Sequence, residues 1–165
     1  MGVGSCFAIN LPININIDSP VLEEQTEQNL SEQSQLSQSQ TEEIISPLIL
    51  LAEDNEANIA TFFSYLRAKG YRILLATDGQ QAIDLAKAHH PDLILMDIQM
   101  PVMDGLEAIK QIRIDPNLVD IPIIALTALA MADDRERCLT AGANDYLAKP
   151  VKLRELFLSI QKLLS

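Results

Sequence analysis

The chain has 165 residues, about one domain's worth, and 48% of them are apolar, enough to bury a single core. Its formal net charge is -11, which argues against a nucleic-acid-binding surface, because such a surface needs clustered Lys and Arg. No apolar run reaches the roughly 18–20 residues that cross a bilayer. The two cysteines, far apart in the chain, exclude a disulfide framework and fit a reducing compartment. We therefore expect a cytoplasmic chain that itself contacts neither nucleic acid nor membrane.

The charge is uneven along the chain. Residues 1–46 contain seven acids and no Lys or Arg, and Glu23–Glu43 is almost entirely Gln, Glu, Ser and Thr. Such a stretch buries too little apolar surface to offset its ordering entropy. We predict that residues 16–46 form a disordered, acidic, Gln- and Ser-rich linker. A short polar helix is the alternative, because Glu and Gln are good helix formers.

From Pro47 onward, short apolar runs alternate with apolar residues at helical spacing. Five such strand–helix units predict an α/β domain over residues 47–165, a doubly wound five-stranded parallel sheet with helices on both faces. The predicted strands are, in chain order, Leu48–Ala52, Ile73–Ala76, Leu93–Met96, Ile121–Leu126 and Tyr146–Ala148. The first three predicted helices run through Ile59 and Leu66 up to Gly70, through Ala82 and Ala86 up to Pro91, and through Leu106 and Ile112 up to Asp115-Pro116, and a turn at Asp78-Gly79 precedes the second of them. The last two predicted helices are Asp133–Ala141 and Leu153 to Leu164.

Polar residues follow four of the five predicted strands. Glu53 and Asp54 follow the first, Asp97 ends the third, Thr127 ends the fourth and Lys149 follows the fifth. In open α/β sheets, sites form outside the carboxyl ends of the strands. We therefore expect these five side chains to share one rim of the sheet.

Three carboxylates close together repel one another unless a cation is present. Mg²⁺ suits such a group, because it prefers oxygen ligands, and one divalent ion with Lys149 brings the site near neutrality. A site of this kind is suited to phosphoryl transfer, in which one carboxylate forms an acyl phosphate. Asp97 is the best candidate for that nucleophile, because it stands alone at the end of a central strand. Glu53 and Asp54 form a pair suited to holding a metal.

Four motifs occur in order across this domain: LILLAEDN (48–55), DLILMDIQMPVMDG (92–105), IPIIALTA (121–128) and DYLAKPV (145–151). Together they resemble the receiver domain of two-component response regulators. The resemblance implies a flavodoxin-like (βα)5 fold with strand order 2-1-3-4-5 and a cis Lys149-Pro150 bond. It also implies a partner, either a histidine kinase or a histidine phosphotransfer protein, that supplies a phosphoryl group from phosphohistidine.

The resemblance further implies that Asp97 is the phosphoacceptor. It places Mg²⁺ on Asp54, Asp97 and the backbone carbonyl of Gln99, with Glu53 acting through water. Glu53 stands where this family often has Asp, which leaves the carboxylate in place. The implied chemistry is limited to self-phosphorylation and self-dephosphorylation, so the chain is expected not to be an enzyme otherwise.

A switch is implied as well. In the family, Thr127 and Lys149 contact the phosphoryl oxygens, and Tyr146 is the aromatic residue that moves when Thr127 is drawn toward them. The face made by the fourth helix, the fifth strand and the fifth helix is then remodelled for a downstream partner. The residues alone also allow a purely structural interpretation of both positions. Thr127 is then a hydrogen-bonded hydroxyl at a strand end, and Tyr146 packs at the edge of the core.

Two alternatives stay open at this point. A haloacid-dehalogenase-like phosphatase also uses a strand-end Asp nucleophile, but it requires a second Asp where this chain has Gln99. Residues 2–13 (GVGSCFAINLPI) resemble the last glycine-rich turn and strand of the ATP-binding domain of sensor histidine kinases. Residues 1–15 would then be a remnant of that domain, and the receiver an internal phosphorelay or autoregulatory module of a hybrid histidine kinase.

Overall fold

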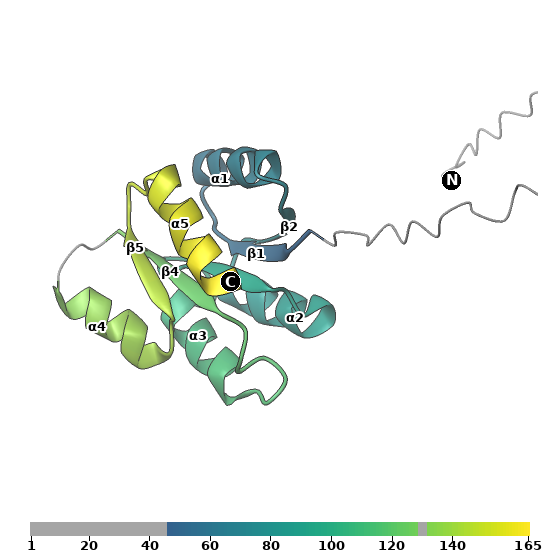
Figure 1. The fold of residues 1–165 in the computed structure, drawn as a ribbon. Helices are drawn as coiled ribbons and strands as arrows, with labels where there is room; N and C mark the ends of the chain where they lie inside the picture. Colours follow the sequence, from purple (N-terminus) through teal and green to yellow (C-terminus); the bar gives the residue numbers. More distant parts are fainter. Residues whose placement is uncertain (1–45, 129–131) are drawn as a thin grey trace, which may run out of the picture. The chain divides into compact units, whose positions relative to one another are not determined.

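The computed structural model describes residues 46–128 and 132–165, where strands and helices alternate (Figure 1). The predicted kinase remnant and nearly all of the predicted linker lie outside these residues, so that division of the chain stays a prediction. In chain order the elements are β1 (Leu48–Ala52), α1 (Glu56–Ala68), β2 (Arg72–Ala76), α2 (Gly79–His89), β3 (Leu93–Asp97), α3 (Gly105–Ile114), β4 (Ile123–Thr127), α4 (Ala132–Ala141), β5 (Asp145–Ala148) and α5 (Leu153–Leu164).

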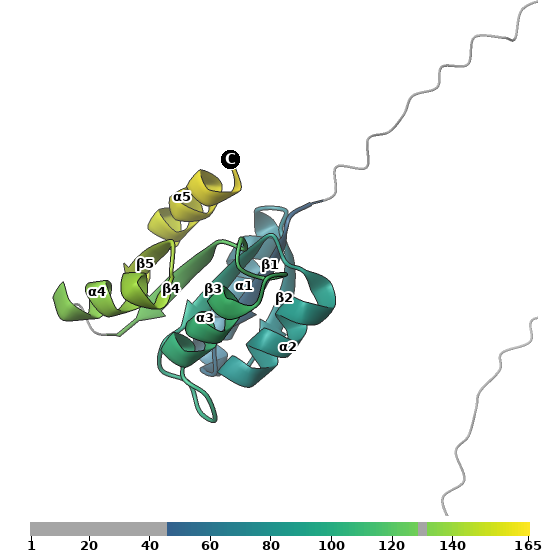
Figure 2. The same cartoon turned by 90° about the horizontal axis from the view of Figure 1, so that it is seen from below.

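The five strands form one parallel sheet in the order β2-β1-β3-β4-β5, which confirms the predicted fold and strand order. Helices α1 and α5 cover one face, and α2, α3 and α4 cover the other (Figures 1 and 2). Alternate residues of β1 serve the two cores: Ile49 and Leu51 pack under α1 and α5, whereas Leu50 and Ala52 pack under α2 and α3. Burial on both faces explains why the strands are continuous apolar runs.

Two local predictions were wrong. Asp78-Gly79 is the start of α2 and not a separate turn, because the Asp78 carboxylate caps the helix by accepting from the Gln81 N–H at 2.9 Å. Strand β4 begins two residues later than predicted, at Ile123. The Ile121 N–H donates to the Leu118 carbonyl, within the preceding loop, and Pro122 has no N–H that could donate to a neighbouring strand.

The other predicted strands, and helix α4, agree with the structure to within one residue at each end. Gly70 follows α1 with φ +89°, a left-handed conformation that glycine adopts without strain. The Lys149-Pro150 bond is cis, as the resemblance implied. Within residues 46–128 and 132–165, no helix is both long and apolar enough to cross a membrane.

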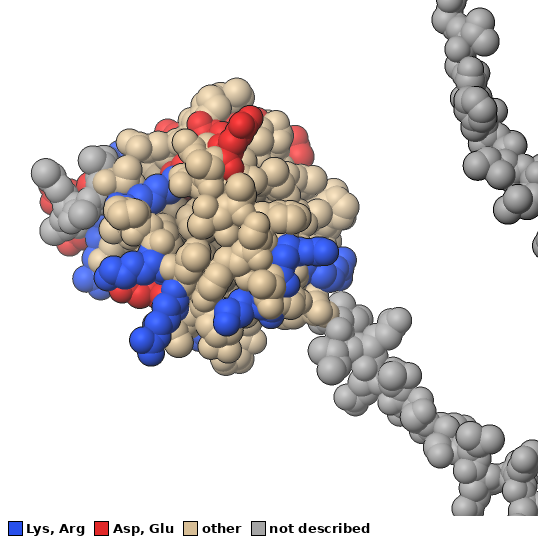
Figure 3. All heavy atoms as spheres, turned by 90° about the horizontal axis from the view of Figure 1, so that it is seen from above, with Lys and Arg blue, Asp and Glu red and all other residues tan. Residues whose placement is uncertain are grey.

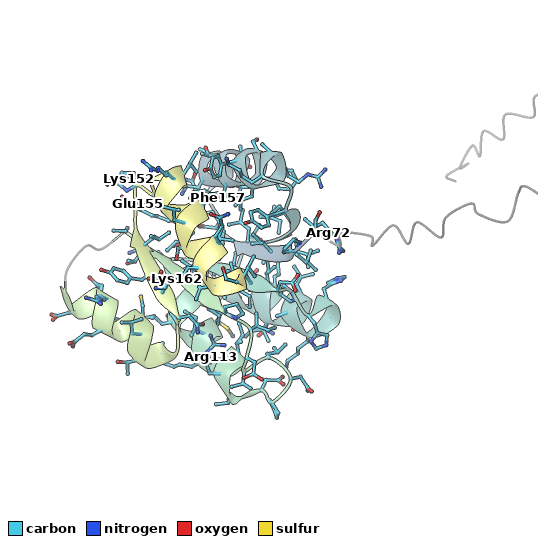
Figure 4. The ribbon with its side chains drawn as sticks, in the orientation of Figure 1. Arg72, Arg113, Lys152, Glu155, Phe157 and Lys162 are labelled. Atoms are coloured by element: carbon cyan, nitrogen blue, oxygen red, sulfur yellow. The ribbon has the colours of Figure 1, made fainter. Side chains whose placement is uncertain are left out.

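Arg113, in the last turn of α3 (Figure 4), ties this helix to the loops that precede β4 and β5. Its guanidinium donates to the carbonyl of Gly142 at 2.7 Å, to those of Val119 and Ile121 at 3.1 and 2.9 Å, and to the Asn144 side chain at 2.8 Å. These bonds satisfy carbonyls at the end of α4 and in the loop before β4. The side chain therefore acts as an internal cap that orients β4 and β5.

Replacing Arg113 by Met keeps an unbranched stem but leaves those carbonyls without their charged donor. We expect Arg113→Met to lower the free energy of unfolding by about 2–3 kcal/mol, because hydrogen bonds to charged groups are the stronger ones. Urea unfolding followed by circular dichroism measures it. The control is Lys110→Met, on an exposed position of the same helix, which should change stability by less than about 0.5 kcal/mol. Equal effects of the two substitutions would contradict this role.

Candidate functional site

The parallel register brings the polar strand ends to one rim of the sheet. Asp97 is the last residue of β3, Glu53 directly follows β1, and Lys149 directly follows β5. Thr127 ends β4 between them, buried, and its carbonyl accepts from the Lys149 N–H at 2.7 Å. The expectation that residues 53, 97, 127 and 149 share a rim is met by the structure.

The Lys149 ammonium joins two of the carboxylates. Its Nζ donates to Asp97 Oδ2 at 2.7 Å and to Glu53 Oε2 at 2.8 Å. Glu53 lies 96 positions and Asp97 52 positions before Lys149 in the sequence. Both acids are almost fully buried, and the lysine side chain is 18% exposed. Charged groups this buried are tolerated because they are paired and hydrogen bonded.

Asp54 completes the acidic cluster. One carboxylate oxygen from each of Glu53, Asp54 and Asp97 lies within 4.8 Å of the others, which is a spacing that a metal ion can bridge. Glu53 and Asp97 are buried, whereas Asp54 is exposed. The cluster is therefore open to solvent on the Asp54 side.

Burial and charge act in opposite directions at this cluster. Burial raises the pKa of Asp97 above its ordinary value, and the Glu53 charge adds to the rise, while the hydrogen bond and charge of Lys149 and the Gln99 N–H lower it in part. Burial opposes the charge of Lys149, but its bonds to Asp97 and Glu53 outweigh this and raise the pKa of the ammonium. Asp97 is thus a desolvated carboxyl beside a cation that stays protonated.

The segment after β3 is fixed closely against Asp97. The Gln99 N–H donates to Asp97 Oδ1 at 3.1 Å, and the Gly105 N–H donates to the Ile98 carbonyl at 3.0 Å. A Cβ at Gly105 would overlap the Asp97 carbonyl oxygen, so only glycine allows α3 to begin this close to the strand end. Asp104 caps the helix there by accepting from the Glu107 N–H.

Tyr146, the predicted switch residue, lies on β5 and is half-buried against the core that α2, α3 and α4 cover. The guanidinium of Arg135, on α4, lies over its ring, with Cζ 5.5 Å from the ring centroid. The ring therefore bridges the core edge and α4. Its role as a switch stays a prediction.

Two asparagines at the start of α1 that sequence analysis did not assign to the site contact it. Asn55 caps α1 by accepting from the N–H groups of Ala57 and Asn58, and its own N–H points to Glu53 Oε1 at 3.3 Å. The Asn58 side chain donates to the same oxygen at 3.0 Å. The available signal was the position of Asn58 in the first turn of a helix that starts at the rim.

Some of the basic residues lie at the carboxyl ends of helices. Basic residues occupy the last turns of four helices, at the rim away from the acidic cluster, namely Arg67, Lys87, Arg113 and Lys162. Figure 3 shows a group of acidic side chains at the top of the view, with basic ones across its lower half and left side and further acidic ones at the left. Helix carboxyl ends favour cations. The acidic cluster itself stays negative and attractive to a cation, because its three carboxylates face the single ammonium of Lys149.

A family model described as the response regulator receiver domain matches residues 49–161. The chain belongs to this family. Among curated relatives, the polar-differentiation response regulator DivK of Brucella ovis is 42% identical over 116 residues, which are 70% of this chain and 94% of DivK. The receiver domain of the sensor histidine kinase PA1611 from Pseudomonas aeruginosa PAO1, solved with magnesium in its active site cleft, is 48% identical, with a TM-score of 0.68 over 72% of this chain and 98% of that chain.

A third similar structure contains a partner. The Saccharomyces cerevisiae complex of the phosphotransfer protein Ypd1 with the receiver domain of Ssk1 matches at 37% identity and a TM-score of 0.68, over 72% of this chain and 88% of that chain. The predicted function as a receiver of a two-component system is confirmed by the family. The curated response regulators do not favour the hybrid-kinase alternative, and the family match leaves the phosphatase alternative without support.

Because the pKa of Asp97 is raised in the folded domain, the free energy of unfolding should depend on pH. The folded domain holds the Asp97 proton more tightly than the unfolded chain, so ionisation costs folding free energy as pH rises from 3.8, the ordinary value, through the folded pKa. At pH 7 without divalent ions this cost opposes folding. We expect Asp97→Asn to raise the urea midpoint of unfolding at pH 7, and the gain to shrink as pH falls toward 4.

The control is Asp84→Asn, on an exposed position of α2, which should shift the midpoint little at either pH. An Asp97→Asn variant that is less stable than the parent chain at pH 7 would contradict the assignment of burial as the dominant effect.

Proposed function

We propose that the chain is a phosphoacceptor whose Asp97 carboxylate receives a phosphoryl group from a partner phosphohistidine, with Mg²⁺ as cofactor. The observation that carries the proposal is the Lys149 ammonium held at 2.7 Å from Asp97 Oδ2, inside a cluster of three carboxylates. A buried carboxylate can act as the nucleophile, and the fixed cation beside it stabilises the negative charge of the phosphoryl group that it receives.

The donor set fits Mg²⁺. Three carboxylates against one ammonium leave an unbalanced negative charge, and all the donors are oxygens. We assign Asp54, Asp97 and the backbone carbonyl of Gln99 as direct ligands, with Glu53 acting through water. The magnesium in the similar PA1611 receiver supports this assignment. When bound, the ion neutralises charge that develops on the phosphoryl oxygens.

The transfer is an in-line displacement at phosphorus. An Asp97 carboxylate oxygen forms the new P–O bond, the P–N bond to the partner imidazole breaks, and the electron pair of that bond leaves with the imidazole nitrogen. Lys149 holds one phosphoryl oxygen by charge and hydrogen bond, and the Thr127 hydroxyl holds another. The chain supplies no further reaction: water later cleaves the acyl phosphate, so the activity is limited to self-phosphorylation and self-dephosphorylation.

Two kinds of partner are implied. The phosphodonor is a histidine kinase or a histidine phosphotransfer protein, which the similar Ypd1–Ssk1 complex supports. The downstream partner binds the face of α4, β5 and α5, where the pull of the phosphoryl group on Thr127 changes the packing of Tyr146. A cytoplasmic location stays a prediction from the low cysteine content.

Incubation with acetyl phosphate and Mg²⁺ tests the phosphoacceptor. We expect the intact mass of the full chain to gain one phosphoryl group, which is lost when EDTA replaces the metal. Asp97→Asn should gain none, and Asp104→Asn, an altered helix cap nearby, should be labelled. Equal labelling of the Asp97→Asn variant would contradict the assignment.

Replacing Lys149 by Met separates metal binding from transfer. Removing the ammonium makes the cluster more negative, so Mg²⁺ should bind more tightly, while phosphorylation by acetyl phosphate should fall on the order of 100-fold, because a charge-stabilising donor is lost. Calorimetry and intact mass measure the two effects. Lys152→Met, on the exposed start of α5 beside Glu155 (Figure 4), is the matched control and should change neither. A parallel loss of Mg²⁺ affinity and rate would contradict this separation of transfer from metal binding.

A further inference from the structure

The carboxylate of Glu53 is held from both ends. It is completely buried, and Oε2 accepts from Lys149 Nζ at 2.8 Å. On the other side, Oε1 accepts from the Asn58 side chain at 3.0 Å and from the Asn55 N–H at the longer distance of 3.3 Å. Among these contacts, the Asn58 amide is the closer donor to Oε1 and the one that a substitution removes without changing the backbone.

Asn58 is itself fixed in place. Its N–H donates at 3.1 Å to the side chain of Asn55, which caps α1. Its side chain is therefore presented from the first turn of a capped helix, half-buried, with little freedom to move away from Glu53. A rigid donor on Oε1 prevents rotation of the carboxylate, which in turn keeps Oε2 aimed at Lys149.

The chemistry of the amide suits this position. A neutral donor satisfies the buried oxygen without adding a cation. A lysine or arginine in the same place would bring the cluster of Glu53, Asp54 and Asp97 closer to neutrality before a divalent ion arrived. The amide thus orders the carboxylate and leaves the negative charge that attracts the metal.

We propose that Asn58 is a positioning residue that orients Glu53, and through it Lys149 and the divalent-ion site, for phosphoryl transfer to Asp97. The inference rests on the proposed function and deepens it. Outer-shell partners of ligating carboxylates typically affect metal affinity or activity by about 10–100-fold. Without the amide, Glu53 rotates, Lys149 loses one of its two fixed partners, and its ammonium is no longer held where the transferred group arrives.

The test compares Asn58→Leu, which keeps the number and branching of the side-chain heavy atoms and removes the donor, with the parent chain of 165 residues. We expect roughly tenfold slower phosphorylation by acetyl phosphate and weaker Mg²⁺ binding by calorimetry. Thr61→Val on the same helix removes a side-chain bond to the Ala57 carbonyl without touching the site, and should leave both values unchanged. Should Asn58→Leu fail to fold in thermal unfolding, Asn58→Ala replaces it, with the same expected losses.

A double-mutant cycle with Glu53→Gln shows whether Asn58 acts through Glu53. If it does, Asn58→Leu lowers the rate and the Mg²⁺ affinity in the parent chain but adds little in the Glu53→Gln background. Equal losses in both backgrounds, or parent-like values in Asn58→Leu, would overturn the inference. A parent chain that gains no phosphoryl group would instead overturn the proposed function, so the two failures are distinguishable.

Discussion

The structure depends on a half-buried cation placed between two buried carboxylates. Lys149 reaches Asp97 and Glu53 from the end of β5, and these charges are tolerated at the edge of the core because they are paired and hydrogen bonded. The ion pairs therefore join the carboxyl ends of β1, β3 and β5 at one rim of the sheet. The apolar faces of the sheet hold those ends in place, so the packing energy of the core fixes the geometry of the site.

The same constraint gives the site its chemistry. Because the lysine balances only part of the negative charge, the cluster remains attractive to a divalent ion at its open side, near Asp54. Asp97 is desolvated enough to raise its pKa, yet it is held by Lys149 and by the Gln99 N–H in one orientation. A nucleophile prepared in this way needs little rearrangement when a phosphoryl group arrives.

The sequence predicted those features that depend on strand topology. Parallel strands bring the residues at their carboxyl ends to one rim, so Glu53, Asp97 and Lys149 were found by their position alone. The contact of Asn58 with Glu53 was not predicted, because it depends on the direction in which a helical side chain leaves its first turn. The bonds of Arg113 were missed for a related reason, since they join segments whose spacing is set by packing and not by any repeat in the sequence.

A crystal structure grown with Mg²⁺ and beryllofluoride, a mimic of the phosphoryl group, tests the central claim most directly. We predict the mimic on an Asp97 carboxylate oxygen, the ion beside Asp54 and Asp97, and Lys149 Nζ within hydrogen-bond distance of a fluorine. Beryllofluoride bound elsewhere, or an ion held without Asp97, would contradict it.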